Sequence, residues 1–278
     1  MTAHEFTLIV FLVSISAGFL GALTGLGGGI VVTPALTLLL GVDLRYAIGA
    51  SLVSVIATSS GAASAYVRDG LSNIRIGMFL EMATTFGAIC GAFLASKTPT
   101  RALAVLFGLV LLHSAWQVIQ ARTQRSRARE DDAVADKLQL SGVYQSPEGA
   151  IAYHISRAKA GFGLMYVAGM VSGLLGIGSG SLKVIAMDRI MGIPFKVSTA
   201  TSSFMIGVTG VASAAIYLKR GYIHPLIALP VMLGVLAGSM AGARLLPRLP
   251  VKTLRHIFAT AVAVIGVQMI AQGLRGRL

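Results

Sequence analysis

Two glycine-rich stretches contain the residues of this chain that are best suited to chemistry. The first reads GLGGG, from Gly25 to Gly29, and the second reads GIGSG, from Gly176 to Gly180, 151 positions later. Glycine in a helix interior costs about 1 kcal/mol relative to alanine, so this density of glycine predicts an interrupted helix. A helix that begins after such a break exposes the free N–H groups of its first turn and the positive end of its dipole. The two stretches therefore predict an anion site.

The predicted substrate site consists of the end of each stretch and of donors near it. Glycine leaves the amides open to a ligand, as in phosphate-binding loops. Serine and threonine residues that match between the two halves are candidate hydroxyl donors to an oxyanion. Lys183 lies one turn beyond Gly180 and is the candidate countercharge. The complete predicted set is Gly27, Gly28, Gly29, Gly178, Ser179, Gly180, Ser51, Ser202, Thr58, Thr209 and Lys183.

Close helix packing is the alternative interpretation of the glycine residues. The GxxxG spacing that lets two helices approach each other occurs at Gly25/Gly29, Gly87/Gly91 and Gly238/Gly242. For the last two pairs packing is the preferred interpretation, whereas GLGGG and GIGSG contain more glycine than packing requires. The hydroxyl groups have an alternative too, because serine and threonine can bond back to their own helix.

Four ionisable side chains lie within or beside apolar runs, where a charge requires a partner. They are Glu81, Lys183, Asp188 and Arg189. Glu81, Asp188 and Arg189 could pair, gate or carry protons, although a structural role is preferred for these three. The chain shows no Ser-His-Asp order, metal-ligand spacing or phosphate-loop lysine. No enzyme activity, cofactor or metal site is therefore predicted.

The elements that hold these residues are predicted to be membrane-spanning helices. Of the 278 residues, 55% are hydrophobic and 12% are charged, about half the charged fraction of a soluble domain. Apolar runs such as 47–67 and 76–95 approach the roughly 20 residues that a helix needs to cross a bilayer. The sequence predicts an all-α integral membrane protein, with several passes through the cell inner (plasma) membrane.

The chain contains two copies of one unit. Residues 18–120 align with residues 169–271 at a constant offset of 151, without a gap. Each unit is predicted to hold five helical pieces, and its short second piece either re-enters the membrane or completes a broken helix. Such duplication is typical of secondary transporters, and by that analogy we expect inverted repeats with about 8–10 helical segments.

The predicted organisation is a first membrane repeat at 1–120, a polar cytoplasmic linker at 121–160 and a second membrane repeat at 161–278. The linker begins with the basic cluster RTQRSRAR directly after an apolar helix, which favours the cytoplasm. The net charge of +13 is attributed mainly to this positive-inside bias and to affinity for anionic lipid. It also favours an anionic solute.

Several motifs agree with a known family. They are GALTGLGGGIVVTPALTLLLG near the start, GLLGIGSGSLKV in the second copy, and the segments GASLVSVIATS and TATSSFMIGVTG. Together they resemble the TauE/SafE sulfite exporter family, also called the sulfonate or anion permease family, over both repeats. Family members typically keep GxGGG and a following proline in both halves. This chain has Ser179 in the second triplet, Ile185 at the position of Pro34, and Lys183 in addition, which makes the two half-sites unequal.

The resemblance implies secondary transport, as an exporter, of a small sulfur-containing anion such as sulfite, sulfoacetate, thiosulfate or another organosulfonate. We expect alternating access, with the anion bound at paired helix N-termini near the midplane. The alternatives are an anion-selective channel, a carrier of small organic carboxylates, and a scaffold protein whose repeats only pack. The expected partners are a small anionic substrate and the lipid bilayer, without nucleic acid. Coupling to H⁺ or Na⁺ and the oligomeric state stay open.

Overall fold

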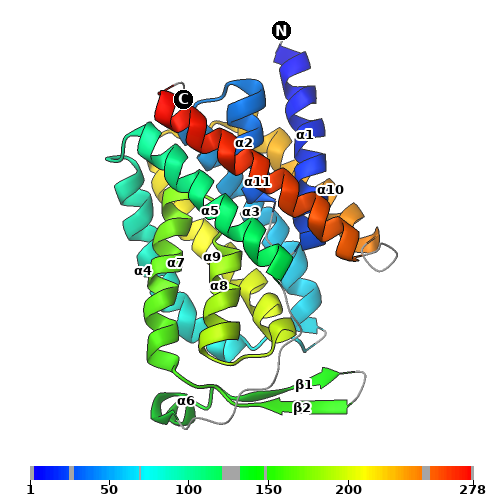
Figure 1. Ribbon diagram of the computed structural model, residues 1–278, viewed down its shortest axis with the longest axis vertical. Coiled ribbons are helices and arrows are strands. Elements are labelled where there is room, and N and C mark those ends of the chain that lie inside the picture. Colours follow the sequence, from blue (N-terminus) through cyan, green and yellow to red (C-terminus); the bar gives the residue numbers. More distant parts are fainter. Residues whose placement is uncertain are drawn as a thin grey trace.

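The computed structural model describes residues 3–24, 28–68, 70–120, 132–146, 149–245 and 251–276. These residues form a bundle of helices with a small β hairpin at one end (Figure 1). The first repeat contains α1 (Ala3–Thr24), α2 (Gly29–Pro34), α3 (Leu44–Arg68), α4 (Ile74–Ala95) and α5 (Thr100–Gln120). The second repeat contains α7 (Ala158–Leu175), α8 (Gly180–Ile185), α9 (Phe195–Lys219), α10 (Pro225–Leu245) and α11 (Val251–Arg275).

Five helices among the described residues are long and apolar enough to cross a membrane. These stretches are His4–Gly21, Ile74–Ala95, Thr100–Gln117, Ala158–Leu175 and Phe195–Lys219. Large apolar side chains are also exposed on the outside of the bundle. On α4 they recur every three or four positions, at Met78, Met82, Phe86, Ile89 and Phe93. A continuous apolar face of this kind is typical of contact with lipid, so the chain is a multi-pass, helical membrane protein.

The two repeats share helix boundaries as well as sequence. The helices α2 and α8 begin and end 151 positions apart, and so do α3 and α9. A π-helical turn follows the short helix in each copy, η1 (Ala35–Leu39) and η2 (Ala186–Ile190). Pro34, which lacks an N–H group, precedes the first turn, but Ile185 precedes the second. The π-helical turn therefore does not depend on the proline.

The two repeats pack mainly through contacts between a helix of one repeat and a helix of the other. α1 of the first repeat packs against α10 of the second, and α7 of the second packs against α4 of the first. The helices α3 and α9, and likewise α5 and α11, pair with their own counterparts. Such reciprocity is expected when two copies are related by an approximate two-fold rotation. α1 begins at the upper end of the molecule in Figure 1, and α7 begins at the lower end, beside the hairpin.

Glycine residues allow the backbones of α1 and α10, and of α4 and α7, to approach each other closely. A Cβ atom on Gly18 would collide with the carbonyl oxygen of Val235, and one on Gly169 would collide with that of Thr84, the equivalent contact in the other copy. The predicted packing role of the GxxxG glycines is confirmed in the same way. Added Cβ atoms would collide with backbone at Gly87, Gly91 and Gly238, whereas the surroundings of Gly242 lie outside the described residues.

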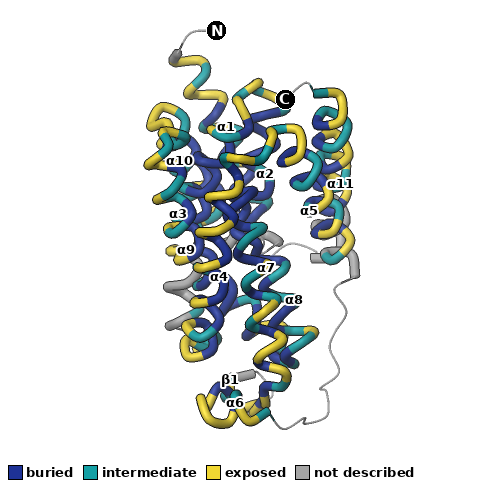
Figure 2. The backbone as a smooth tube through the Cα atoms, turned by 90° about the vertical axis from the view of Figure 1, so that its left-hand side faces the viewer, coloured by how far each residue is buried: buried dark blue, intermediate teal, exposed yellow. Residues whose placement is uncertain are grey.

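The segment between the repeats covers the lower end of the bundle in Figures 1 and 2. It contains α6 (Ala133–Lys137) and an antiparallel hairpin of β1 (Gly142–Ser146) and β2 (Gly149–Tyr153), which the sequence did not predict because five-residue strands give a short pattern. Asp132 caps α6 and also accepts a hydrogen bond from the amide of Ala158, at the start of α7. Burial acts to raise the pKa of Asp132, but these amides lower it overall. The basic cluster at 122–129 lies outside the described residues.

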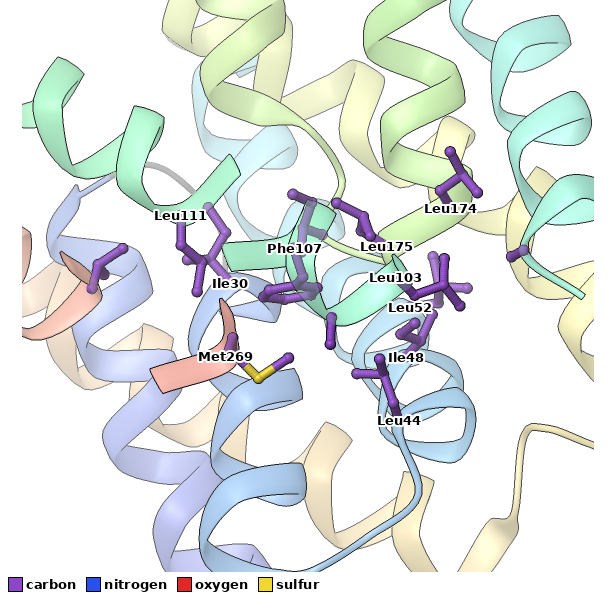
Figure 3. Packing of buried hydrophobic residues seen from close by; sticks show 14 of the residues in the cluster. Ile30, Leu44, Ile48, Leu52, Leu103, Phe107, Leu111, Leu174, Leu175 and Met269 are labelled. Carbon is purple, nitrogen blue, oxygen red and sulfur yellow. The ribbon is translucent and has the colours of Figure 1, made fainter. Parts of the chain in front are cut away.

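An apolar cluster lies in the interior where the two repeats meet. Ile30, at the start of α2, and Leu175, at the end of α7, both belong to it, together with Ile48, Leu52 and Phe107 (Figure 3). Figure 2 shows that buried segments are concentrated in this interior. Because lipid is as apolar as these side chains, close packing stabilises such a cluster in a membrane. It holds the segments next to both glycine stretches at one place.

Candidate functional site

The second glycine stretch interrupts a helix, as the sequence predicted. α7 ends at Leu175 and α8 begins at Gly180, and the residues between them form the second break. Gly176 and Gly178 have φ angles of +67° and +72°, which glycine adopts without steric cost. The amide of Gly176 donates to the carbonyl of Ser172 and closes α7 with a left-handed cap. The glycine residues are thus needed for the break itself.

Ser179 is unfavourable for folding in two respects. Its φ of +45° is left-handed, which costs a residue with a Cβ atom roughly 1–2 kcal/mol. Ser179 is 1% exposed, and its hydroxyl has no hydrogen-bond partner among the described residues, which costs roughly 1–3 kcal/mol. The equivalent Gly28 has a φ of −64°, so the two breaks differ in backbone as well as in residue type. A residue that a glycine could replace with less strain is a candidate for a functional role.

The first glycine stretch lies against the second. Gly28 is the N-cap of α2 and Gly29 is its first residue, whereas Gly27 lies outside the described residues. A Cβ atom added to Gly29 would lie 2.7 Å from the hydroxyl oxygen of Ser51 and 3.3 Å from the carbonyl oxygen of Gly176. The start of α2 and the second break are therefore in direct contact, although they are far apart in the sequence.

Ser51 and Ser202 hold the starts of the two short helices. The Ser51 hydroxyl oxygen lies 3.1 Å from the carbonyl oxygen of Gly29 and 2.9 Å from that of Gly176, so it bridges both repeats. The hydroxyl of Ser202, its equivalent, donates to the carbonyl of Gly180 at 3.3 Å. In this conformation both hydroxyl hydrogens have backbone acceptors. The two serines therefore position the breaks here, and their predicted role as donors to an anion stays a prediction.

Other hydroxyls of the third helix in each repeat bond to their own backbone. Thr58 donates to the carbonyl of Ser54 at 3.0 Å, one turn earlier. The same pattern holds for Ser54, Ser59, Ser60 and Ser203. The alternative interpretation of the hydroxyl groups is confirmed for these residues. Thr209, the equivalent of Thr58, makes the same bond, to the carbonyl of Met205 at 2.9 Å, but it also contacts two charged side chains.

Lys183, Thr209 and Glu81 form a buried charged cluster. The Lys183 ammonium donates to Thr209 Oγ1 at 2.6 Å. The single hydroxyl hydrogen of Thr209 has two acceptors in range, Glu81 Oε1 at 2.6 Å and the carbonyl oxygen of Met205 at 2.9 Å. Thr85 donates to the same carboxylate oxygen at 3.1 Å. Lys183 Nζ lies 3.9 Å from Glu81 Oε2, which has no hydrogen-bond partner in the part of the chain that the structure describes. Lys183 is 0% exposed and Glu81 is 7% exposed, so both charges lie in the protein interior.

The charged cluster joins the two repeats beside the second break. Glu81 comes from α4 of the first repeat, and Lys183 and Thr209 come from α8 and α9 of the second. The amide of Lys183 donates to the carbonyl of Ser179, which places the lysine one turn into α8. Sequence reasoning included Lys183 and Thr209 in the site but not Glu81. A single carboxylate inside the apolar run 76–95 was the signal that could have included it.

A cavity of about 560 Å³ lies elsewhere, between the start of α4 and the hairpin. Asn73, Arg75, Tyr144 and Tyr153 are among its lining residues. Asn73 precedes Glu81 by two turns of α4, about 12 Å along the helix. The cavity is therefore separate from the breaks, where the buried hydroxyls and charges lie. We take the second break and the start of α2 as the candidate site, because the buried hydroxyl and charged groups lie beside them.

This duplicated bundle of apolar helices, with the start of α2 in contact with the second break and a charged cluster beside it, has the architecture of a membrane transporter. The family model described as "Sulfite exporter TauE/SafE" matches residues 10–269, and the chain belongs to this family. The family resemblance that the motifs suggested is thereby confirmed.

Curated relatives agree with this class. The chain is 28% identical over 274 residues to "Probable membrane transporter protein YunE" of Bacillus subtilis (strain 168), with 96% of this chain and 98% of that one covered. It is 24% identical to "Probable membrane transporter protein YdhB" of the same strain, with 95% and 98% covered. It is 27% identical to a "Probable membrane transporter protein" of Haemophilus influenzae, with 95% and 98% covered. No solved structure matches the chain significantly.

Proposed function

We propose that this protein is a secondary carrier that exports a small sulfur-containing anion, such as sulfite, sulfoacetate or another organosulfonate, across the cell inner membrane. The observation that carries the proposal is the second break, where the Ser179 hydroxyl is buried without a partner among the described residues and Lys183 follows one turn later in α8. An oxyanion would accept hydrogen bonds from that hydroxyl and from the open amides of α8. The family description supports the sulfur chemistry and the direction of transport.

Alternating access is the proposed mechanism. The two repeats would be inverted relative to each other, which the opposite starting ends of α1 and α7 in Figure 1 support. Because Ser51 and Gly29 connect the two breaks, a rocking of one repeat against the other would change the surroundings of both at once. An anion bound there would face each side of the membrane in turn.

The experiment that tests the function measures binding and flux with the purified protein. In a thermal-shift panel of sulfite, sulfate, thiosulfate, sulfoacetate, isethionate, taurine and short carboxylates, we expect a sulfur anion to raise the melting temperature most. In proteoliposomes, uptake of that anion should saturate and should be accelerated by the same anion inside. Flux that does not saturate and shows no counterflow would identify a channel instead. Stabilisation by carboxylates alone would assign the organic-acid alternative.

A Ser179→Gly variant tests the site within this function. Glycine removes both the left-handed strain and the unpartnered hydroxyl, so we expect the free energy of unfolding to rise by about 1–3 kcal/mol. The affinity for the anion should fall roughly ten- to a hundredfold, because a hydrogen bond to a charged ligand is worth about 1.5–3 kcal/mol. Thermal melts and counterflow kinetics measure the two effects.

The matched control for this variant is Ser203→Ala, because the Ser203 hydroxyl bonds to the carbonyl of Thr199 in its own helix. It should leave transport unchanged. Full transport by Ser179→Gly would remove Ser179 from the site.

A further inference from the structure

The charged cluster has no counterpart at the equivalent position, where the same helices of the opposite repeats meet. By the constant offset of 151, the residues equivalent to Lys183, Thr209 and Glu81 are Val32, Thr58 and Met232. The threonine is kept, but the two charges are replaced by apolar side chains. Val32 is as well buried as Lys183, at 1% and 0% exposure. The same fold therefore packs this position without charges, and the cluster is not required by the architecture.

Two buried charges that the fold does not require need another explanation. Charged side chains within membrane segments are costly, and they commonly mark ion pathways and proton relays. The hydrogen bonds of the cluster are also incomplete, because Glu81 Oε2 has no hydrogen-bond partner and lies 3.9 Å from the ammonium of Lys183. This oxygen can accept a proton without the loss of a hydrogen bond to another side chain. Thr209, between the two charges, holds the carboxylate through the other oxygen, Oε1.

The helices around Glu81 define which charges can act on it. Helices α7 and α9 pack against α4, and α8 packs against α9. Their ionisable side chains, with those of η2, are Lys159, Tyr166, Lys183, Asp188, Arg189, Lys196, Tyr217 and Lys219. The three lysines Lys159, Lys196 and Lys219 are exposed at helix ends, and the Tyr217 hydroxyl donates to carbonyls of α7. The Lys183 ammonium lies 3.9 Å from the carboxylate of Glu81, so these two groups contribute to the local charge together.

We propose that Glu81 is the proton-coupling carboxylate of this carrier and that one proton enters the site with each anion. The inference rests on the proposed function. Without substrate, the Glu81 carboxylate neutralises the Lys183 ammonium. When a monoanion binds beside Ser179 and Lys183, a hydronium ion of the medium transfers its proton to Glu81 Oε2 and becomes water, and the anion takes over the neutralisation of Lys183. The cluster has no net charge in either state, which avoids an uncompensated charge in the membrane interior.

Proton-coupled transport of this kind is electroneutral for a monoanion. The direction of net flux then follows the gradients of the anion and of pH, and the membrane potential has no effect on it. Export occurs where the anion is concentrated inside the cell. An inward proton gradient drives accumulation in vesicles, which gives the proposal a direct readout.

The first experiment uses wild-type protein and isethionate, a monoanion whose sulfonate stays ionised across the working pH range. In weakly buffered detergent solution, we expect binding to remove about one proton from the medium per anion bound. In proteoliposomes, an inward pH gradient should drive accumulation of isethionate, and a change of membrane potential should not. Binding or transport without proton uptake would overturn the coupling. Protein that neither binds nor moves isethionate would refute the proposed sulfonate transport, and the coupling with it.

The second experiment uses Glu81→Gln, which imitates the protonated carboxyl group and can still accept the hydrogen bond from Thr209. We expect anion exchange to persist at a reduced rate, because Lys183 can still bind the anion but lacks its counterion in the substrate-free protein. Accumulation driven by the pH gradient should be lost, as should proton uptake on binding. Glu81→Asp, which restores a carboxylate, should recover both. Accumulation by Glu81→Gln that still follows the pH gradient would contradict the assignment of Glu81.

Discussion

Replacement of Lys183 by valine is expected to abolish anion transport and to lower the free energy of unfolding by about 3–5 kcal/mol. The stability effect arises because Glu81 would be left in the interior without its counterion, and a buried unpaired charge is strongly destabilising. The transport effect arises because the anion would lose its countercharge one turn from Ser179. Chemical denaturation in detergent and flux into proteoliposomes measure the two quantities.

The double variant Lys183→Val with Glu81→Met separates these effects. It gives the cluster the residues that the first repeat has at Val32 and Met232. Replacing a buried ion pair by apolar residues of similar volume is often neutral or stabilising by about 1–4 kcal/mol, so we expect stability at or above that of the wild type. Transport should stay absent. If the double variant is as unstable as Lys183→Val alone, the two charges do not act as a pair.

Replacement of Gly29 by alanine is expected to reduce transport at least tenfold. The added Cβ atom would lie 2.5 Å from a methyl group of Val55 and 2.7 Å from the hydroxyl oxygen of Ser51. It would push α2 away from the second break and disturb the Ser51 bridge between the repeats. Overpacking of this kind typically costs about 1–3 kcal/mol of stability. Counterflow rates and melting temperatures in detergent test both effects.

The control for Gly29→Ala is Gly163→Ala in α7. An added Cβ atom on Gly163 has no neighbouring atom within 4 Å, so transport should be unchanged. Stability should rise by up to about 1 kcal/mol, because alanine has the higher helix propensity. A normal rate for Gly29→Ala would show that the contact between the two breaks is not needed for transport.

The unequal half-sites that the sequence indicated have a structural counterpart. Ser179 has a left-handed backbone where Gly28 has a right-handed one, and Lys183 pairs with a carboxylate where Val32 is apolar. Both differences fall in the second repeat. The second break therefore supplies the polar groups of the candidate site, and the start of α2 supplies a close, uncharged neighbour.

The sequence by itself determined the membrane-spanning helices, the duplication and the position of the second break. These features depend on local properties. The length of an apolar run, the glycine content and the constant offset between the two copies can all be read from the linear sequence. The boundaries of α3 and α9 and the break after Leu175 follow such signals closely. The short hairpin between the repeats was not predicted from such signals.

Tertiary structure alone decided that α1 packs against α10 and that α4 packs against α7. It also decided that Gly29 contacts Gly176 and that Glu81 is the partner of Lys183. In the sequence, Asp188 and Arg189 were equally eligible partners for a buried charge. The choice depends on which helix faces pack together, and a pair of residues on different helices leaves no periodic signal in either helix. The physical reason is that local composition fixes where a helix runs and stops, whereas distances between helices are set by the packing of all of them together.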